Sequence, residues 1–287
     1  MPSVLCCGLV TADLFYHYDD PVVWGGKFKS ASSNIEPGGG AAIAASAIAA
    51  LGGDASVVGR IGQDILGDWV QADLNKRNVD TKFLQKVQGY YTPNSAIITT
   101  FDGERTVFNA RDSRLLSARS DIHQFPAFDA VLTDTRWPAG AEMLLKAAQL
   151  RNKPAILDAE APVSFAEDVI HLATHIIFSE QGLSDYAGKC DENALIKVAR
   201  ETGVWVAVTR GSKSVICCHE NKLTYFAPPK VKTRNTLGAG DVWHGAFALS
   251  MGQTGSESVA VEFANDVAAM KVSLPNGYPT LAMLQGK

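Results

Sequence analysis

Residues 235–241 read Asn-Thr-Leu-Gly-Ala-Gly-Asp, and they lead directly into residues 242–251, an apolar stretch with the composition of a helix. Small residues let backbone N–H groups crowd around an anion, and the positive end of the helix dipole attracts negative charge. Asp241 would then face a substrate hydroxyl and act as a base. The alternative is an ordinary turn with Asp241 as the helix N-cap. Both interpretations predict a helix that begins at this segment.

The composition is typical of one large globular domain with a small appendage. The chain has 287 residues, of which 46% are hydrophobic. Its net charge is −4, and the basic residues are scattered, which argues against nucleic acid or an anionic membrane as a partner. The N-terminal apolar run has no basic segment before it and is too short to span a membrane, so it predicts a buried first strand.

The cysteines and histidines form no recognisable metal or disulfide pattern. Four of the five cysteines stand in adjacent pairs, at 6–7 and 217–218, which is neither a disulfide framework nor a zinc motif. We expect reduced core thiols in a cytoplasmic protein. The six histidines are spread singly, and His244 is expected to pack within the helix rather than bind a ligand.

Short β-rich apolar runs alternate with longer helical patterns, which favours βαβ units around a mainly parallel sheet. The predicted strands cover residues 4–8, 55–59, 130–133, 155–157, 175–178 and 205–209. The predicted helices cover residues 41–51, 66–77, 139–150, 192–201, 242–251 and 256–272.

Two stretches, residues 14–37 and 88–111, break this rhythm with alternating or turn-rich patterns. The second contains a hairpin signal at Asp102-Gly103. We interpret the two stretches as one small β-sheet that acts as a lid. The remaining residues, 1–13, 38–87 and 112–287, would form the α/β core.

Two common nucleotide-binding motifs are missing. The chain has no Walker A sequence, because residues 211–214, Gly-Ser-Lys-Ser, have the wrong order. Residues 238–240 lack the third glycine of a dinucleotide-binding fingerprint. A P-loop NTPase and a Rossmann dehydrogenase are therefore both disfavoured.

Four segments together resemble the ribokinase-like (pfkB) carbohydrate kinases, and the resemblance covers essentially the whole chain. They are the 235–241 signature, Gly8-x-x-x-x-Asp13, the Gly-Gly-Gly-Ala-Ala of residues 38–42, and the Gly-Arg-Ile-Gly-Gln-Asp-x-x-Gly of residues 59–67. The resemblance implies a three-layer α/β/α sandwich with a β lid. It also implies transfer of the γ-phosphoryl group of ATP to a sugar hydroxyl.

The resemblance assigns the reacting groups, and the chemistry is consistent with them. Phosphoryl transfer needs in-line positioning and charge neutralisation, which N–H donors, a metal ion and one carboxylate can supply. Asp241 would be the base, and the amides of Gly238, Ala239 and Gly240 would form the anion hole. The sugar would contact Asp13, at the carboxyl edge of the first strand, and the backbone of Gly38, Gly39 and Gly40. A solvated loop aspartate and a plain turn are the alternatives for these two segments.

The resemblance also implies positions on the nucleotide side. Thr209 and Gly211 would approach the phosphates and ribose, and Asn265 and Ala269 would belong to the adenine-pocket helix. A solvent-facing helix residue is the alternative for Asn265. Relatives carry Asn-x-x-Glu where residues 179–182 read Ser-Glu-Gln-Gly, so Glu180 is the candidate magnesium ligand.

Two departures from the family pattern bear on ligands. Ile43 replaces an asparagine that binds sugar in many relatives, which argues against plain ribokinase specificity. Asn235 replaces an aspartate that helps to bind a monovalent cation. We therefore expect weak or absent potassium activation. The alternative is that Asn235 only caps the turn.

Three residues narrow the expected substrate. Lys27, Asn109 and Arg136 look like the positions where sulfofructose kinases, the members of the family that this chain is taken to resemble, hold a sulfonate. Lys as a point charge and Arg as a planar fork would together select an anionic tail on the sugar. The alternatives are a solvated Lys27, a turn residue at Asn109 and an Arg136 paired with Asp134.

The sequence thus predicts an ATP- and magnesium-dependent sugar kinase that phosphorylates a primary hydroxyl of a ketose, with an anionic tail such as that of 6-deoxy-6-sulfofructose. A neutral-sugar kinase of the ketohexokinase or ribokinase type is one rival. A non-catalytic protein that senses sugar or nucleotide is the other. The lid sheet cannot bury both faces alone, so we also expect a homodimer formed through the lid.

Overall fold

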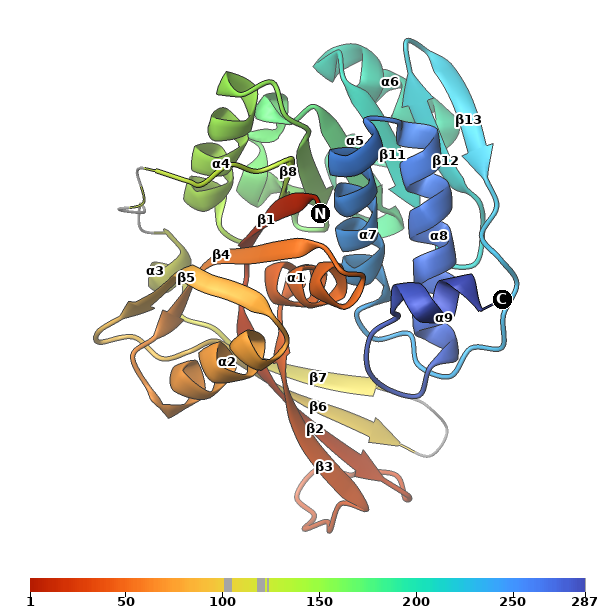
Figure 1. The fold of residues 1–287 in the computed structure, drawn as a ribbon. Coiled ribbons are helices and arrows are strands. Elements are labelled where there is room, and N and C mark those ends of the chain that lie inside the picture. The colour runs from red at the N-terminus through yellow and green to blue at the C-terminus, as the bar shows by residue number, and fades with distance from the viewer. Residues whose placement is uncertain (101–104, 118–121, 123, 287) are drawn as a thin grey trace.

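A large parallel sheet forms the centre of the molecule (Figure 1). The computed structural model describes every residue except 101–104, 118–121, 123 and 287. Within these described residues, nine strands form the sheet in the order β13-β12-β11-β10-β9-β8-β1-β4-β5. All neighbours are parallel except β12 and β13, which add antiparallel strands at one edge. The strands are β1 (Ser3–Gly8), β4 (Asp54–Gly62), β5 (Val79–Val87), β8 (Ala130–Asp134), β9 (Ala155–Ala159), β10 (His175–Ser179), β11 (Trp205–Thr209), β12 (Val215–His219) and β13 (Lys222–Phe226).

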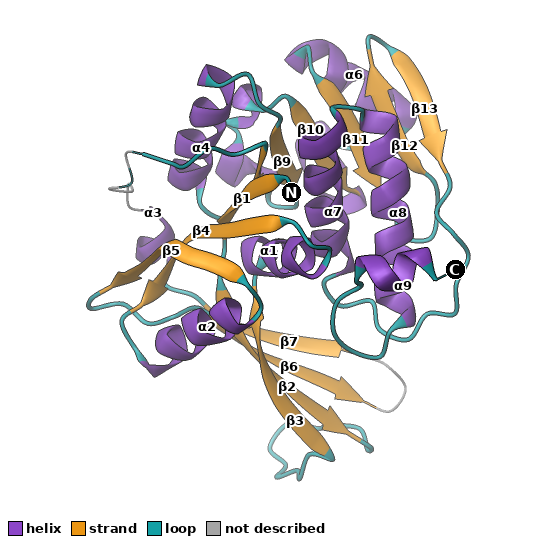
Figure 2. Ribbon diagram, in the orientation of Figure 1, coloured by secondary structure: helices purple, strands orange, loops and turns teal. Residues whose placement is uncertain are grey.

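Helices cover both faces of this sheet (Figure 2). Successive side chains of a strand point to opposite faces, so Val4 and Cys6 of β1 belong to one core cluster while Leu5 and Cys7 belong to the other. The first cluster includes residues of α1 (Gly40–Ala50), α7 (Ala239–Thr254) and α8 (Glu257–Ser273). The second includes residues of α4 (Pro138–Leu150), α5 (Glu180–Ala187) and α6 (Glu192–Thr202). The result is a three-layer α/β/α sandwich.

A second, smaller sheet projects from one side of this core (Figure 1). Its order is β3-β2-β6-β7, with β2 antiparallel to β3, parallel to β6, and β6 antiparallel to β7. The strands are β2 (Thr11–Tyr18), β3 (Ser32–Gly38), β6 (Asn94–Thr100) and β7 (Arg105–Ala110). Helix α2 (Ile65–Lys76) packs near β3 and β5, and α3 (Ser113–Ser117) and α9 (Leu281–Gln285) are short.

The predicted fold class is confirmed, as are all six predicted strands and all six predicted helices, with shifted ends. The strands β5, β12 and β13 of the large sheet and the helices α3, α5 and α9 were missed. β5 and β13 are the two edge strands, and their sequences mix polar with apolar residues because one side meets solvent. The hairpin predicted at Asp102-Gly103 lies outside the described residues.

The lid boundaries at 14–37 and 88–111 differ from the observed strands. The small sheet already begins at Thr11, so Asp13 lies within β2 and not in the core segment to which it was assigned. Residues 88–93 form the connection before β6. Among the described helices, none has both the length and the apolar composition required to cross a bilayer. All five cysteines are free, and the four in the adjacent pairs are buried, whereas Cys190 is half-buried.

Candidate active site

The signature turn leads into α7 through a left-handed glycine. Gly238 is the N-cap of this helix and has φ 66°, a conformation that favours glycine. The Ala239 N–H donates to the carbonyl of Thr236 at 3.2 Å, which closes the turn. The first N–H groups of a helix have no partner within it, so this end of α7 can receive an anion and places Asp241 in the first turn.

Three carboxylates surround the backbone of residues 38–40. A Cβ at Gly38 would collide with Asp13 Oδ2, and a Cβ at Gly40 would lie 3.2 Å from Asp241 Oδ1 and 3.4 Å from Asp134 Oδ2. Gly39 has φ 85° and is the N-cap of α1. The glycine segment therefore lets Asp13 and Asp241, which are far apart in sequence, border one small volume.

Electrostatics favour a proton-accepting role for Asp241. Burial, together with the negative charges of Glu160, Asp134 and Asp13, raises the pKa of Asp241 from 3.8 to about 7. A carboxylate with a pKa near neutrality is a good general base for a hydroxyl proton. The pKa of Asp158, on strand β9, is also raised. Burial is the main cause, and the negative charge of Asp241 is the next.

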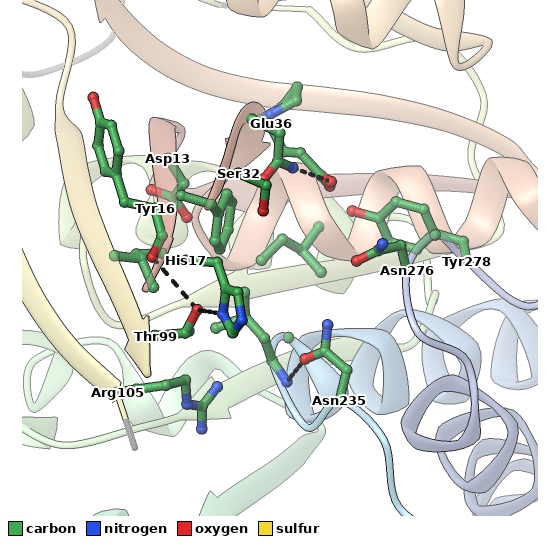
Figure 3. A pocket seen from close by; sticks show the side chains of 18 of the residues that line it. Asp13, Tyr16, His17, Ser32, Glu36, Thr99, Arg105, Asn235, Asn276 and Tyr278 are labelled. Carbon is green, nitrogen blue, oxygen red and sulfur yellow. Dashed lines mark hydrogen bonds between the residues drawn. The ribbon is translucent and has the colours of Figure 1, made fainter. Parts of the chain in front are cut away.

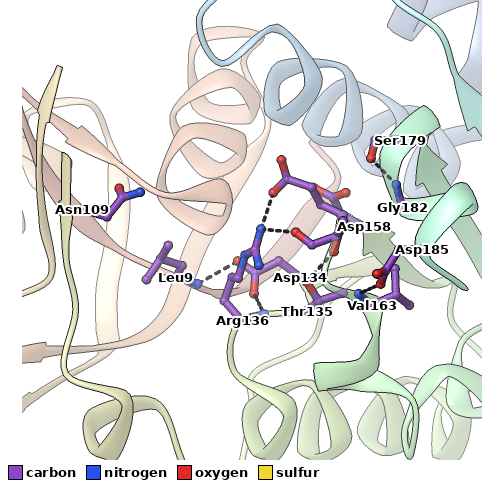
Figure 4. Close-up of polar contacts among 12 residues, drawn as sticks. Leu9, Asn109, Asp134, Thr135, Arg136, Asp158, Val163, Ser179, Gly182 and Asp185 are labelled. Atoms are coloured by element: carbon purple, nitrogen blue, oxygen red, sulfur yellow. Dashed lines mark hydrogen bonds and ion pairs between the residues drawn. The ribbon is translucent and has the colours of Figure 1, made fainter. Parts of the chain in front are cut away.

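Asp134 has a structural role at the end of β8. Its carboxylate accepts from the backbone N–H of Leu9 at 2.8 Å and from the backbone N–H of Arg136 at 2.9 Å (Figure 4). These bonds fix the β1–β2 turn, and burial is the main reason that the pKa of Asp134 is raised. Arg136 donates from Nη2 to Glu160 Oε2 at 2.9 Å and to the Ala161 carbonyl at 2.8 Å. The Arg136 guanidinium is thus held by Glu160 and not by the Asp134 side chain.

Asp13 belongs to a polar row across the small sheet. Strand register places Asp13 opposite Ser95 and Ser95 opposite Asn109. Thr11 Oγ1 donates to Asp13 Oδ1 at 2.7 Å, and Ser95 Oγ donates to Asn109 Oδ1 at 3.0 Å. Burial raises the pKa of Asp13 in spite of the hydrogen bond from Thr11. Asn109 therefore lies in the same row as Asp13, which is consistent with both residues contacting one sugar.

Arg111 connects this row to Arg136, and it was missed in the sequence. Its Nη2 lies 3.4 Å from Asn109 Oδ1, a long hydrogen bond. Burial and the neighbouring Arg136 charge lower the pKa of Arg111. Both arginines line a cavity of about 430 Å³ whose other walls are Ser113, Leu116, Pro138, Ala139 and Phe165.

Lys27 lies apart from this group. Lys27 is exposed in the loop between β2 and β3. Its neighbour Phe28 packs against Tyr18, with the centroids of the two rings 6.2 Å apart. Tyr18 is five residues beyond Asp13 along an extended strand, or roughly 17 Å. The structure therefore brings Asn109 and Arg136 together through Arg111, whereas Lys27 belongs neither to the polar row nor to the cavity that the two arginines line.

The expected nucleotide-side residues lie on β11, the following turn and α8. Thr209 ends β11, and Gly211, with φ 60°, forms the turn. Asn265 is buried and not solvent-facing: its Oδ1 accepts from Trp243 Nε1 at 2.8 Å, and its Nδ2 donates to the Phe226 carbonyl at 3.3 Å. It lines a cavity of about 380 Å³, whereas Ala269 is buried in α8.

The two candidate cation ligands differ in their surroundings. Glu180 begins α5 and pairs with Lys213 at 3.4 Å, and no cluster of three or more metal-binding side chains occurs among the residues that the structure describes. Asn235 Nδ2 donates to the Pro275 carbonyl at 3.1 Å, and its Oδ1 accepts from the Leu237 N–H at 2.9 Å. The Asn235 amide thus joins two loops directly.

Glu160 and Asp158 were also missed. They lie at the carboxyl end of β9, where open α/β sheets place their ligands, so strand position was the available signal. His244 was expected to pack within the helix, and it does: it is buried on α7, with Nδ1 at 3.3 Å from Asp158 Oδ2, and burial lowers its pKa to about 4.

Comparison with known proteins identifies the family. The profile of the pfkB family of carbohydrate kinases matches residues 1–281. The chain belongs to this family. This pfkB kinase is 23% identical to a ribokinase of Bacillus subtilis over 98% of the chain and 97% of the relative. It is 25% identical to a fructokinase of Escherichia coli, and the match covers 76% of the chain and 78% of the relative.

The fold comparison agrees. A solved structure from Agrobacterium tumefaciens, provisionally named a ribokinase, superposes with a TM-score of 0.92 at 30% identity, covering 99% of this chain and 96% of the other. The pfkB kinase described here is therefore a carbohydrate kinase of the ribokinase and fructokinase type, which transfers a phosphoryl group from ATP to an alcohol group.

Proposed function

We propose that Asp241 removes the proton from the acceptor hydroxyl while the amides at the start of α7, those of the N-cap Gly238 and of Ala239 and Gly240, receive the negative charge of the γ-phosphoryl group. The position of Asp241 carries this proposal. It stands at the start of α7, beside the glycine segment that also borders Asp13, and its pKa is raised to about 7. Asp13 binds hydroxyls of the sugar, and the bond to phosphorus forms as the proton moves to Asp241.

The acceptor in this proposal is a ketose with an anionic tail, such as a sulfonate or phosphate. Arg111 and Arg136 support it, because two neighbouring guanidinium groups line one cavity next to the Asp13–Asn109 row. Planar guanidinium groups suit the oxygens of such an anion. Lys27, the third expected contact, has no place in this arrangement within one chain. A neutral-sugar kinase remains the rival, since Glu160 already neutralises Arg136.

ATP would enter from the side of Thr209, Gly211 and Asn265. Magnesium is commonly held by one or two carboxylates together with substrate phosphates, so the chain needs no metal cage, and Glu180 fits as one such carboxylate. When bound, the ion would neutralise charge on the phosphates. The Asn235 amide supports weak or absent potassium activation, because it already spans the two loops.

A protein that only senses sugar or nucleotide is the second candidate, favoured by Ile43, Asn235 and the altered 179–182 segment. An assay of ADP release over a panel of neutral, phosphorylated and sulfonated ketoses separates the three candidates. An anionic ketose should give the highest kcat/KM. A preference for a neutral sugar would refute the anionic tail, and binding without turnover would favour the sensor.

We further propose a homodimer formed through the small sheet, in a cytoplasmic protein. Apolar side chains in the loop that joins β2 to β3 of this sheet are exposed, Trp24 by 91% and Val23 by 64%. The Trp24 ring also contacts that of Phe108, itself 41% exposed. Sedimentation as a fully active monomer at micromolar concentration would contradict the dimer.

A further inference from the structure

A second polar row crosses the small sheet at the end away from Asp13. Strand register places His17 opposite Thr99 and Thr99 opposite Arg105. Residues two apart in a strand share a face, so this row lies on the same face as Asp13 and Asn109. Figure 3 shows His17, Thr99 and Arg105 at a cavity with Asn235 on its other side. This cavity, of about 300 Å³, is also lined by Asp13 and Gly238.

Arg105 bridges the cavity to the signature turn. Its Nη2 donates to Thr236 Oγ1 at 3.2 Å, across 131 residues of sequence. The Thr236 carbonyl in turn accepts from the Ala239 N–H, the bond that closes the turn before α7. One arginine therefore connects the sheet that carries the sugar-binding row to the turn that carries the anion-binding amides and Asp241.

The Arg105–Thr236 bond does little for the stability of the fold. Both residues are exposed, and exposed polar contacts contribute little to the free energy of unfolding. The Arg105 guanidinium makes no other hydrogen bond or ion pair with the described part of the chain that would hold it in place. Its geometric effect is larger, because a misplacement of about 1 Å between reacting groups can cost about 100-fold in rate.

We propose that Arg105 is a positioning residue, which through Thr236 holds the Asp13–Asn109 row in register with Asp241. This proposal rests on the assignment of Asp241 as the base. A sugar bound to the small sheet is then at the right distance from the phosphoryl group only while the Arg105–Thr236 hydrogen bond is present. Binding of sugar and of nucleotide should therefore favour each other through this contact.

Steady-state kinetics of Arg105→Ala and Thr236→Val, singly and combined, test the proposal. Each single variant should lower kcat about 10-fold, leave the Kd for ADP without sugar within about 3-fold, and leave Tm unchanged. The double variant should be no slower than either single one, because both remove the same bond. Arg105→Lys and Thr236→Ser should recover part of the rate. Arg200→Ala, on α6 and bonded to Asn221, is the matched control and should behave as wild type.

Three results would overturn the proposal. The first is a kcat of Arg105→Ala within 2-fold of wild type. The second is a normal Thr236→Val combined with a raised KM for ATP in Arg105→Ala, which would mean that the arginine binds phosphate directly. The third is a double variant whose loss of kcat equals the product of the losses in the two single variants. Asp241→Asn tests the proposed base independently of the role of Arg105. If Asp241→Asn stays active, the assignment of the base is wrong, whereas the comparison of the single and double variants at Arg105 and Thr236 can still be made.

Discussion

Asp134 and Asp241 converge on Gly40 from two different elements: a Cβ added to Gly40 would lie 3.4 Å from Asp134 Oδ2 and 3.2 Å from Asp241 Oδ1. Asp134 ends β8 and is fixed by the backbone of Leu9 and Arg136. Its charge is one of those that raise the pKa of Asp241. The candidate base is thus tuned by a neighbouring carboxylate that has its own structural role.

Gly40→Ala should lower activity while the fold survives. The added methyl group would lie 3.2 Å from Asp241 Oδ1, which is tighter than an ordinary contact, so Asp241 must shift by a few tenths of an ångström. Because the backbone of Gly40 is helical, alanine itself is well tolerated there. We expect kcat/KM to fall about 10-fold or more with little change in Tm, as measured by kinetics and calorimetry. Unchanged kcat/KM would mean that the two carboxylates are not constrained by residue 40.

The pH dependence should report Asp241. Only the deprotonated carboxylate can accept the hydroxyl proton, so kcat/KM should rise with pH and level off above about 7. The raised pKa has the opposite effect on stability: the folded state binds more protons than the unfolded state between pH 3.8 and about 7, so stability falls as the pH rises through this window. Asp241→Asn should reduce this fall, and the part that stays comes from Asp13, Asp134 and Asp158, whose pKa values are also raised. Equal pH dependence of Tm in wild type and Asp241→Asn would place the shift elsewhere.

Arg111→Ala and Arg136→Ala should discriminate between sugars. Each should raise KM for a sulfonated or phosphorylated ketose about 10- to 100-fold and leave turnover of a neutral ketose almost unchanged, since a charge-assisted hydrogen bond contributes roughly 1.5–3 kcal/mol. Lys27→Ala is the comparison, because Lys27 lies away from the two arginines. Equal losses on charged and neutral sugars would mean that the arginines shape the strand ends.

Potassium should have little effect on the rate. The Asn235 amide bonds to both Pro275 and Leu237, so no ion is needed to join these loops. Replacing KCl by tetramethylammonium chloride should change kcat by less than about 2-fold at constant ionic strength. A strong loss of activity that KCl restores would show that a cation site persists in spite of Asn235.

The sequence predicted the elements that carry strong local patterns, and it failed where position depends on pairing. The 235–241 segment marked the turn before α7 correctly, because a left-handed glycine and a helix start are local features. The alignment of Asn109 with Asp13 required the register of two strand pairs. Arg111 and Lys27 are both basic residues near expected contacts, and only the fold shows which of them lies beside Arg136. The edge strand β13 was missed for a similar reason, since a partly exposed strand loses the continuous apolar pattern.

The most direct test of the account compares wild type and Asp241→Asn in sugar-dependent ADP release with a ketose that the wild type phosphorylates. Asp241→Asn should lower kcat by at least about 100-fold, because the hydroxyl proton loses its acceptor, while the Kd for ATP stays within a few fold. A matched Asp158→Asn measurement checks whether any buried carboxylate has the same effect. Near wild-type kcat in Asp241→Asn would contradict the account.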